Sequence, residues 1–70
     1  PRYAIAWNNK GTTLARLERF DEAKICQDMA TRLKPKYAAA WVNKGEILAK
    51  LGRRKEAIAC YNRAKKLVAA

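Results

Sequence analysis

The sequence has no histidine, only two cysteines, and only six acidic residues against sixteen basic ones. Without histidine, the chain lacks the side chain most often used as a general base and as a metal-binding nitrogen. The two cysteines, Cys26 and Cys60, lie far apart in the chain and form no Cys-x-x-Cys pair. We therefore predict no metal site, no redox site and no cofactor, and we expect both cysteines to fill small apolar positions.

The sequence also lacks a recognisable catalytic arrangement. In a chain without histidine, general acid–base catalysis usually needs a carboxylate tuned by burial, and a nucleophile needs an activating base beside it. All the acidic residues fit solvent-facing helical positions, and they are Glu18, Asp21, Glu22, Asp28, Glu46 and Glu56. We predict that the protein is not an enzyme.

Long apolar runs are absent as well. No stretch of about 18 apolar residues occurs, and no positively charged leader precedes an apolar block. We therefore expect no membrane span, no signal peptide and a cytoplasmic location. A chain of 70 residues allows one domain of modest stability, because it buries only about 60–65% of its unfolded surface.

What the sequence does contain is an internal repeat with a period of 34 residues. Trp7 recurs as Trp41 and Gly11 as Gly45, and the same shift aligns many other identical residues. A fixed period of this length indicates a stacked array, in which each unit buries its apolar face against a neighbour. Because Pro1 aligns with a proline that closes a repeat, we expect the chain to come from, or be built from, a longer array.

Each repeat has the apolar period of two helices. Apolar and small residues at spacings of three and four predict helices over residues 3–17, 21–33, 37–51 and 54–68. Pro35 ends the second helix, and Gly52 is predicted to cap the third helix in the left-handed conformation. Gly11 and Gly45 stand where neighbouring helices must approach closely. The pattern therefore predicts an all-α fold of four antiparallel helices.

The repeated motif resembles the tetratricopeptide repeat family, whose pattern is Trp-x2-Leu-Gly-x2-Tyr followed by Ala-x3-Phe, Ala and Pro. The matching positions are Trp7, Gly11, Leu14, Ala23, Gln27, Ala30 and Pro35 in the first copy, and Trp41, Gly45, Leu48, Ala57, Tyr61 and Ala64 in the second. The resemblance covers essentially the whole chain. It implies a right-handed α-solenoid of two helix-turn-helix repeats, residues 3–36 and 37–70, within one domain spanning residues 1–70.

The first repeat departs from this pattern at two informative positions. Gln27 occupies the position that Tyr61 fills with an aromatic ring, and Glu18 stands where Gly52 caps the other repeat. A residue other than glycine in a left-handed cap costs about 1 kcal/mol. We therefore expect the first turn to be strained or to be built differently from the second turn.

The resemblance implies a protein-interaction module that binds peptide segments in a concave groove lined by the first helix of each repeat. The implied groove residues are Ile5, Asn8, Asn9, Thr12, Arg16, Ala39, Val42, Asn43, Glu46 and Lys50. Asn9 and Asn43 fit the asparagine position of the family, where the amide can hold a peptide backbone. The alternative for both is a local hydrogen bond to the neighbouring helix.

The net charge of +10 suggests a different class of partner. Residues 1–35 carry +3 and residues 36–70 carry +7. Arg53, Arg54 and Lys55 stand at the predicted start of the last helix, where backbone N–H groups favour anions. The alternative function is therefore binding of phosphate or nucleic acid through the second repeat, and the competing explanation is a solvated basic turn.

Two further alternatives follow from the repeat itself. Near-identical repeats are also expected of a structural or engineered scaffold that has no ligand of its own. We further predict a homo-oligomer formed through the last helix, on which Ala57, Tyr61, Ala64 and Val68 are expected to face outward.

Overall fold

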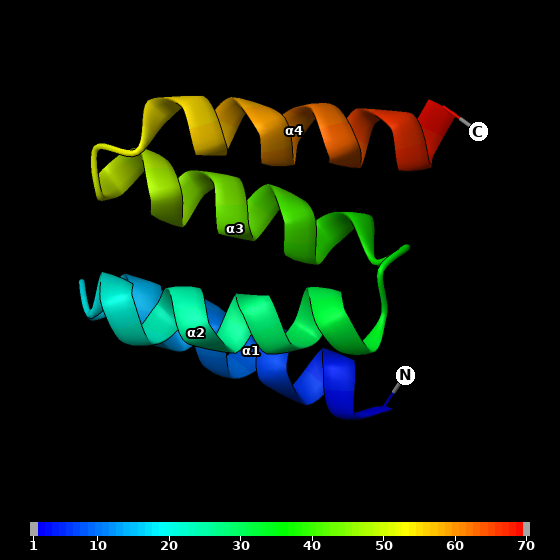
Figure 1. The fold of residues 1–70 in the computed structure, drawn as a ribbon. Coiled ribbons are helices and arrows are strands. Elements are labelled where there is room, and N and C mark those ends of the chain that lie inside the picture. Colours follow the sequence, from blue (N-terminus) through cyan, green and yellow to red (C-terminus); the bar gives the residue numbers. More distant parts are fainter. Residues whose placement is uncertain (1, 70) are drawn as a thin grey trace.

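The computed structural model describes residues 2–69 as four helices joined by short turns (Figure 1). The helices are α1 (Arg2–Arg16), α2 (Phe20–Leu33), α3 (Ala38–Lys50) and α4 (Arg54–Ala69). Each helix begins and ends within one residue of the sequence-based prediction. Residues 2–69 contain no strand, and the predicted all-α class is confirmed.

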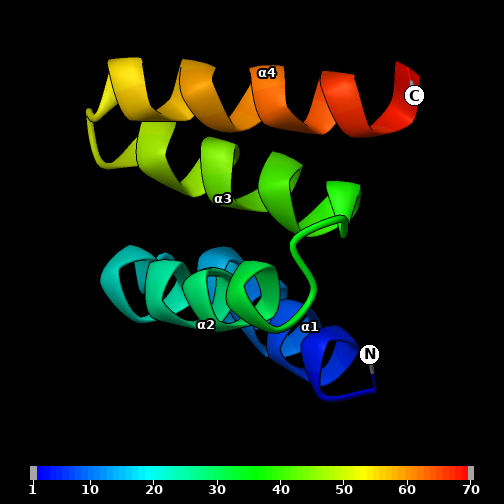
Figure 2. The same cartoon turned by 45° about the vertical axis from the view of Figure 1, so that its right-hand side comes forward.

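The four helices form two antiparallel hairpins that stack side by side. Helix α1 packs on α2 and α3 packs on α4, whereas α2 packs on α3 and joins the two hairpins (Figures 1 and 2). Helix α1 also contacts α3 directly. The resulting body measures 33 × 29 × 15 Å, so it is thin in one direction. Few side chains can be fully buried in such a shape.

The core consists of one apolar cluster in each hairpin. The first contains Leu14, Ala23, Cys26 and Ile47, and the second contains Leu48, Ala57 and Cys60. Ile47 is a residue of α3 that packs into the first hairpin, so the two clusters are linked. Cys26 and Cys60 are both buried and free, in agreement with the predicted packing role. Burial raises the pKa of both thiols.

The turns inside the two hairpins have the same backbone geometry. Gly52 has φ +79° and Glu18, its equivalent, has φ +60°. In each turn the N–H of the following residue reaches back five positions; the Arg19 N–H donates to the Leu14 carbonyl at 2.9 Å. Gly52 is therefore the predicted left-handed cap. The first turn is strained rather than built differently, because a glutamate occupies the glycine position at a cost of about 1 kcal/mol.

The outward face of α4 differs from the one expected from the sequence. Ala57 and Ala64 are only 2% and 4% exposed, so they belong to the buried face, and Tyr61 packs against the core from the same side. The apolar residues that α4 exposes are Ile58 and Val68. Val68 faces outward as expected, but the expectation was wrong for Ala57, Tyr61 and Ala64, because they lie on the face that packs within the hairpin and not on the face that a further repeat would cover. Self-association through α4 stays a prediction.

Candidate protein-binding groove

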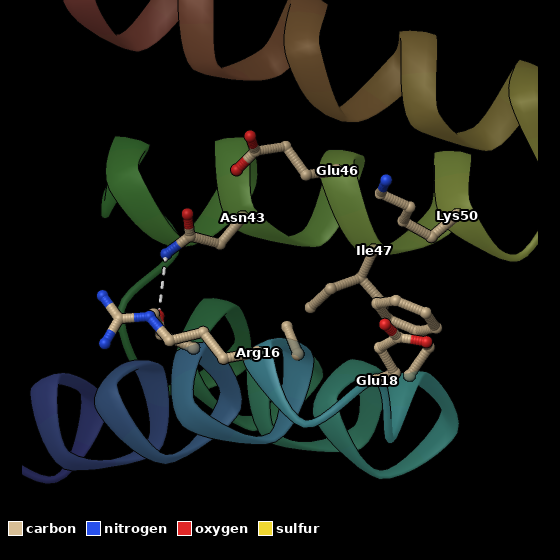
Figure 3. A pocket seen from close by; sticks show the side chains of 9 residues that line it. Arg16, Glu18, Asn43, Glu46, Ile47 and Lys50 are labelled. Carbon is tan, nitrogen blue, oxygen red and sulfur yellow. Dashed lines mark hydrogen bonds between the residues drawn. The ribbon is translucent and has the colours of Figure 1, made fainter.

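A groove of about 490 Å³ lies between α1 and α3, beside the turn that joins α1 to α2 (Figure 3). Nine residues line it, and they are Thr12, Ala15, Arg16, Glu18, Phe20, Asn43, Glu46, Ile47 and Lys50. They come from α1, the first turn, the start of α2, and α3. The site therefore exists only when both hairpins are folded and stacked.

The floor of the groove is apolar. Ile47 is almost completely buried, and the half-buried Ala15 and Phe20 pack against the same cluster. The left-handed turn at Glu18 reverses the chain between α1 and α2, which brings Phe20 next to Ala15. The partly exposed surface of Ala15 and Phe20, above the buried Ile47, is one on which an apolar part of a ligand can be desolvated.

The rim of the groove is charged. Arg16 and Lys50 supply two positive groups, and Glu18 and Glu46 supply two negative groups, all on exposed residues. Among residues 2–69, none of these four side chains takes part in an ion pair. The rim thus offers charges of both signs that a ligand could pair, and its own net charge is zero although the whole chain is strongly basic.

The inner wall is formed by an amide network that joins α1 to α3. The Asn43 amide Nδ2 donates to Asn8 Oδ1 at 2.7 Å and lies 3.5 Å from Thr12 Oγ1. The Asn8 amide Nδ2 donates in turn to the Tyr37 hydroxyl at 3.1 Å. For Asn43, this is the local hydrogen bond that the sequence left open as an alternative to a peptide contact.

The structure places the sequence-predicted groove residues in two sets. Thr12, Arg16, Asn43, Glu46 and Lys50 line the groove. Five others lie outside its lining, with Asn8 buried and Ile5, Asn9, Ala39 and Val42 exposed along the helices.

Sequence reasoning missed the residues of the groove floor and its turn, which are Ala15, Glu18, Phe20 and Ile47. Ile47 falls on the core face of the helical period, and its equivalent Thr13 is exposed, so the repeat carried no signal for it. The unusual glutamate in the first cap was visible in the sequence, but nothing there showed that it borders a groove.

A second cavity of about 340 Å³ lies between α3 and α4, beside Trp41. The ammonium of Lys44 and the guanidinium of Arg63 lie 5.2 Å and 5.5 Å from the centre of the Trp41 ring. The indole Nε1 donates to the Pro35 carbonyl at 2.8 Å. Because these polar groups already have partners inside the chain, the second cavity has a structural rather than a ligand-binding character.

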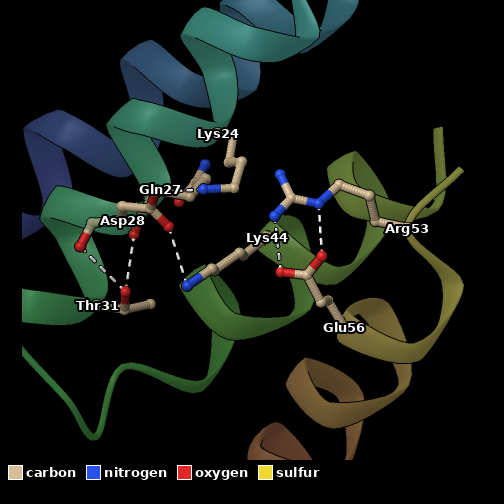
Figure 4. Close-up of polar contacts among 7 residues, drawn as sticks. All are labelled: Lys24, Gln27, Asp28, Thr31, Lys44, Arg53 and Glu56. Atoms are coloured by element: carbon tan, nitrogen blue, oxygen red, sulfur yellow. Dashed lines mark hydrogen bonds and ion pairs between the residues drawn. The ribbon is translucent and has the colours of Figure 1, made fainter. Parts of the chain in front are cut away.

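An ion-pair network joins α2 to α3 next to this cavity (Figure 4). Lys24 Nζ lies 2.8 Å from Asp28 Oδ2, and Lys44 Nζ lies 2.9 Å from Asp28 Oδ1. Burial by itself would raise the pKa of Asp28. The hydrogen bonds and positive charges of Lys24 and Lys44 together lower it by a larger amount, so the pKa lies below its ordinary value. The network stabilises the stacking of the two hairpins.

The basic turn before α4 is partly neutralised from within. The Arg53 guanidinium donates to both carboxylate oxygens of Glu56, with Nη2 2.9 Å from Oε1. The equivalent pair in the first hairpin joins Arg19 to Glu22. Arg54 and Lys55 are exposed and form no ion pair within residues 2–69. Two of the three predicted cations therefore remain available to an external anion.

Residues 2–69 contain neither a candidate membrane span nor a candidate metal cluster. None of the four helices has the length and apolar character needed to cross a membrane. No group of three or more cysteine, aspartate or glutamate side chains in this part of the chain is placed to hold a metal ion.

Paired antiparallel helices that repeat with a fixed period define the class of helical-hairpin repeat proteins. Family models of the tetratricopeptide repeat match residues 4–37 and 38–67, one match for each hairpin. The chain therefore belongs to the tetratricopeptide repeat family. Repeats of this family generally mediate protein–protein interactions and are typically noncatalytic. A comparison with curated proteins found no match to this chain.

Proposed function

We propose that the protein is a noncatalytic interaction module that binds an extended peptide segment of another protein in the groove between α1 and α3. Membership of the tetratricopeptide repeat family supports a protein partner. The observation that carries the location is the half-buried apolar floor of Ala15 and Phe20, which rests on the buried Ile47 and is surrounded by four charged side chains without ion pairs among residues 2–69.

The size of the groove limits the affinity. A ligand that buries roughly 100 Å² of apolar surface on this floor gains about 2.5 kcal/mol. That gain is smaller than the cost of immobilising a peptide, so charged and hydrogen-bonded contacts at the rim must contribute the rest. We therefore expect weak, rapidly exchanging binding, and specificity that depends on the charges of the peptide.

Nuclear magnetic resonance titration of the labelled protein with a library of extended peptides tests the proposal. Shifts are expected at Thr12, Asn43 and Ile47. Lys50→Glu should change the affinity for charged peptides, whereas Lys55→Glu makes the same charge change outside the groove and should leave binding intact. Shifts confined to α4, or equal effects of the two variants, would contradict the groove as the binding site.

The second candidate function is anion binding through the basic repeat. It is favoured by the exposed Arg54 and Lys55 at the start of α4 and by the +7 charge of residues 36–70. Binding to a phosphate polymer should weaken steeply between about 50 and 200 mM salt. Titration with a single-stranded oligonucleotide at both salt concentrations, with Arg54→Ala as the variant, separates this candidate from binding in the neutral-rimmed groove.

A further inference from the structure

Glu18 is unusual because its conformation is unfavourable for a glutamate. Its φ of +60° lies in the left-handed region, where glycine is strongly preferred. The second hairpin uses Gly52 at the equivalent position with the same pattern of hydrogen bonds. The turn itself therefore does not require a carboxylate. A residue held in a strained conformation that the fold does not need is a reason to look for a function of its side chain.

The side chain of Glu18 borders the groove (Figure 3), and the ring of Phe20 belongs to the same lining. Glu46 brings a second carboxylate to the lining from α3. Neither carboxylate forms an ion pair within residues 2–69. The groove lining thus combines an apolar floor with two carboxylates, Glu18 at the first turn and Glu46 on α3, and with the positive groups of Arg16 and Lys50.

The part of the groove beside Glu18 suits one kind of ligand group in particular. The methylene stem of a lysine or arginine can lie on an apolar floor while its charged head reaches a carboxylate at the edge. An aromatic face next to the carboxylate adds a favourable contact for a cation. A neutral aliphatic side chain would fill the same floor but would leave both carboxylates unpaired.

We propose that the groove accepts a lysine or arginine side chain of the bound peptide, and that Glu18 is the residue that selects it. The inference rests on the proposed function, because it names the peptide group that the same groove recognises. Arg16 and Lys50 on the rim are the contacts for acidic groups elsewhere on the peptide. Arg16 and Lys50 stand in regular helical conformations, whereas Glu18 stands in a strained turn at a cost to folding. This difference is the reason for assigning the selectivity to Glu18.

The test uses three capped pentapeptides that differ only at the centre, with the sequence Gly-Ala-X-Ala-Gly. X is lysine, norleucine, which keeps the stem without the charge, or glutamate. Affinities are measured by chemical-shift titration of the groove amides. We expect the lysine peptide to bind about fivefold more tightly than the norleucine peptide at low salt, and the difference to shrink as salt is added.

Two variants separate the charge of Glu18 from its backbone strain. Glu18→Gly should raise the melting temperature by about 5 °C, because the strain is removed, and should abolish the preference for lysine. Glu18→Gln should abolish the preference without that rise. Gly52→Glu, the matched control, places a glutamate in the equivalent turn outside the groove and should leave the preference unchanged.

The outcomes distinguish the inference from the function on which it rests. Equal binding of the lysine and norleucine peptides, a preference that survives in Glu18→Gly, or tightest binding of the glutamate peptide would each overturn the selection of a basic side chain while leaving peptide binding in place. Absence of groove shifts with all three peptides and with the wider library would overturn the proposed function as well.

Discussion

The first hairpin (α1 and α2) and the second hairpin (α3 and α4) share the same backbone arrangement but differ in the side chains at several equivalent positions. Both have the same turn geometry and the same arginine–glutamate pair at the start of the second helix. The second hairpin packs a tyrosine ring against Gly45, whereas the first packs the amide of Gln27 against Gly11. The first hairpin also contains the strained Glu18 and most of the groove. The polar residues that depart from the repeat pattern, Gln27 and Glu18, therefore lie in the first hairpin, which contributes most of the residues that line the candidate site.

The contrast is sharpest at the Gln27 and Tyr61 positions. Gln27 is completely buried, and its Nε2 donates to the Asn8 carbonyl at 3.1 Å. Within residues 2–69, its buried Oε1 receives no hydrogen bond. A buried unpaired acceptor destabilises a fold by about 1–3 kcal/mol. The first hairpin is thus expected to be the less stable of the two, and the experiments below test that difference.

Replacing Tyr61 by glutamine would give the second hairpin the residue of the first, and it should have the largest effect. The variant removes an aromatic ring from the core and buries an amide there, so we expect a loss of about 3 kcal/mol. Urea unfolding followed by circular dichroism measures it. Tyr3→Gln removes the same ring from a position that is 75% exposed and should change little. A loss below about 1 kcal/mol in Tyr61→Gln would mean that the ring does not support the hairpin.

Alanine substitutions at Gly11 and Gly45, the glycines of the repeated motif, should have unequal effects on stability. At Gly45 an added Cβ would lie 2.7 Å from Cε1 of Tyr61, and at Gly11 it would lie 2.6 Å from Nε2 of Gln27. A ring wedged in the core cannot move aside easily, so Gly45→Ala should destabilise by about 2 kcal/mol. At Gly11 the added Cβ would also lie 3.1 Å from the Cys26 Cβ, and moving the Gln27 amide would disturb its bond to the Asn8 carbonyl. The end of a glutamine still moves more easily than a ring, and alanine favours the helix, so Gly11→Ala should cost about 1 kcal/mol, less than Gly45→Ala. Equal losses in the same unfolding assay would show that the two contacts are equally rigid.

Gln27→Met should raise the stability of the first hairpin. Methionine has a similar shape, and it removes the buried unpaired Oε1 together with the single hydrogen bond from Nε2. We expect a gain of about 1 kcal/mol, seen as a higher midpoint of urea unfolding. Thr31→Val, which replaces a neighbouring buried residue whose hydroxyl is fully hydrogen-bonded, serves as a control and should not stabilise. A loss in Gln27→Met would show that the bond to Asn8 outweighs the unpaired oxygen.

Asp28→Asn tests the ion pairs that join the two hairpins. Only the first hairpin supplies a carboxylate at this position, because Asn62 occupies the equivalent position in the second. The lowered pKa of Asp28 means that its carboxylate stabilises the fold above the unfolded pKa of about 3.9, and that this contribution is lost as pH falls through the folded pKa. At pH 7 we expect a loss of about 0.5–1 kcal/mol. The difference between variant and parent should disappear in acid, and a difference that persists at pH 2 would assign the effect to packing.

The sequence predicted the repeat, the helix bounds and the glycine cap because these depend on local properties. Helical period, proline as a terminator and glycine in a left-handed turn are read from neighbouring residues. Resemblance to the family also placed Thr12, Arg16, Asn43, Glu46 and Lys50, which line the groove. The mistaken outer face of α4 shows the limit of this approach, because a period identifies a helical face without identifying its neighbour.

The sequence by itself determined the helical-hairpin repeat, the family and the left-handed cap at Gly52. Only the tertiary structure decided that Ile47 and Phe20 form a floor, that Glu18 stands at its edge, and that the Asn43 amide bonds to Asn8. These arrangements depend on how one hairpin stacks on the other. Contacts between residues distant in the chain follow from packing and desolvation across that interface, and no local pattern encodes them.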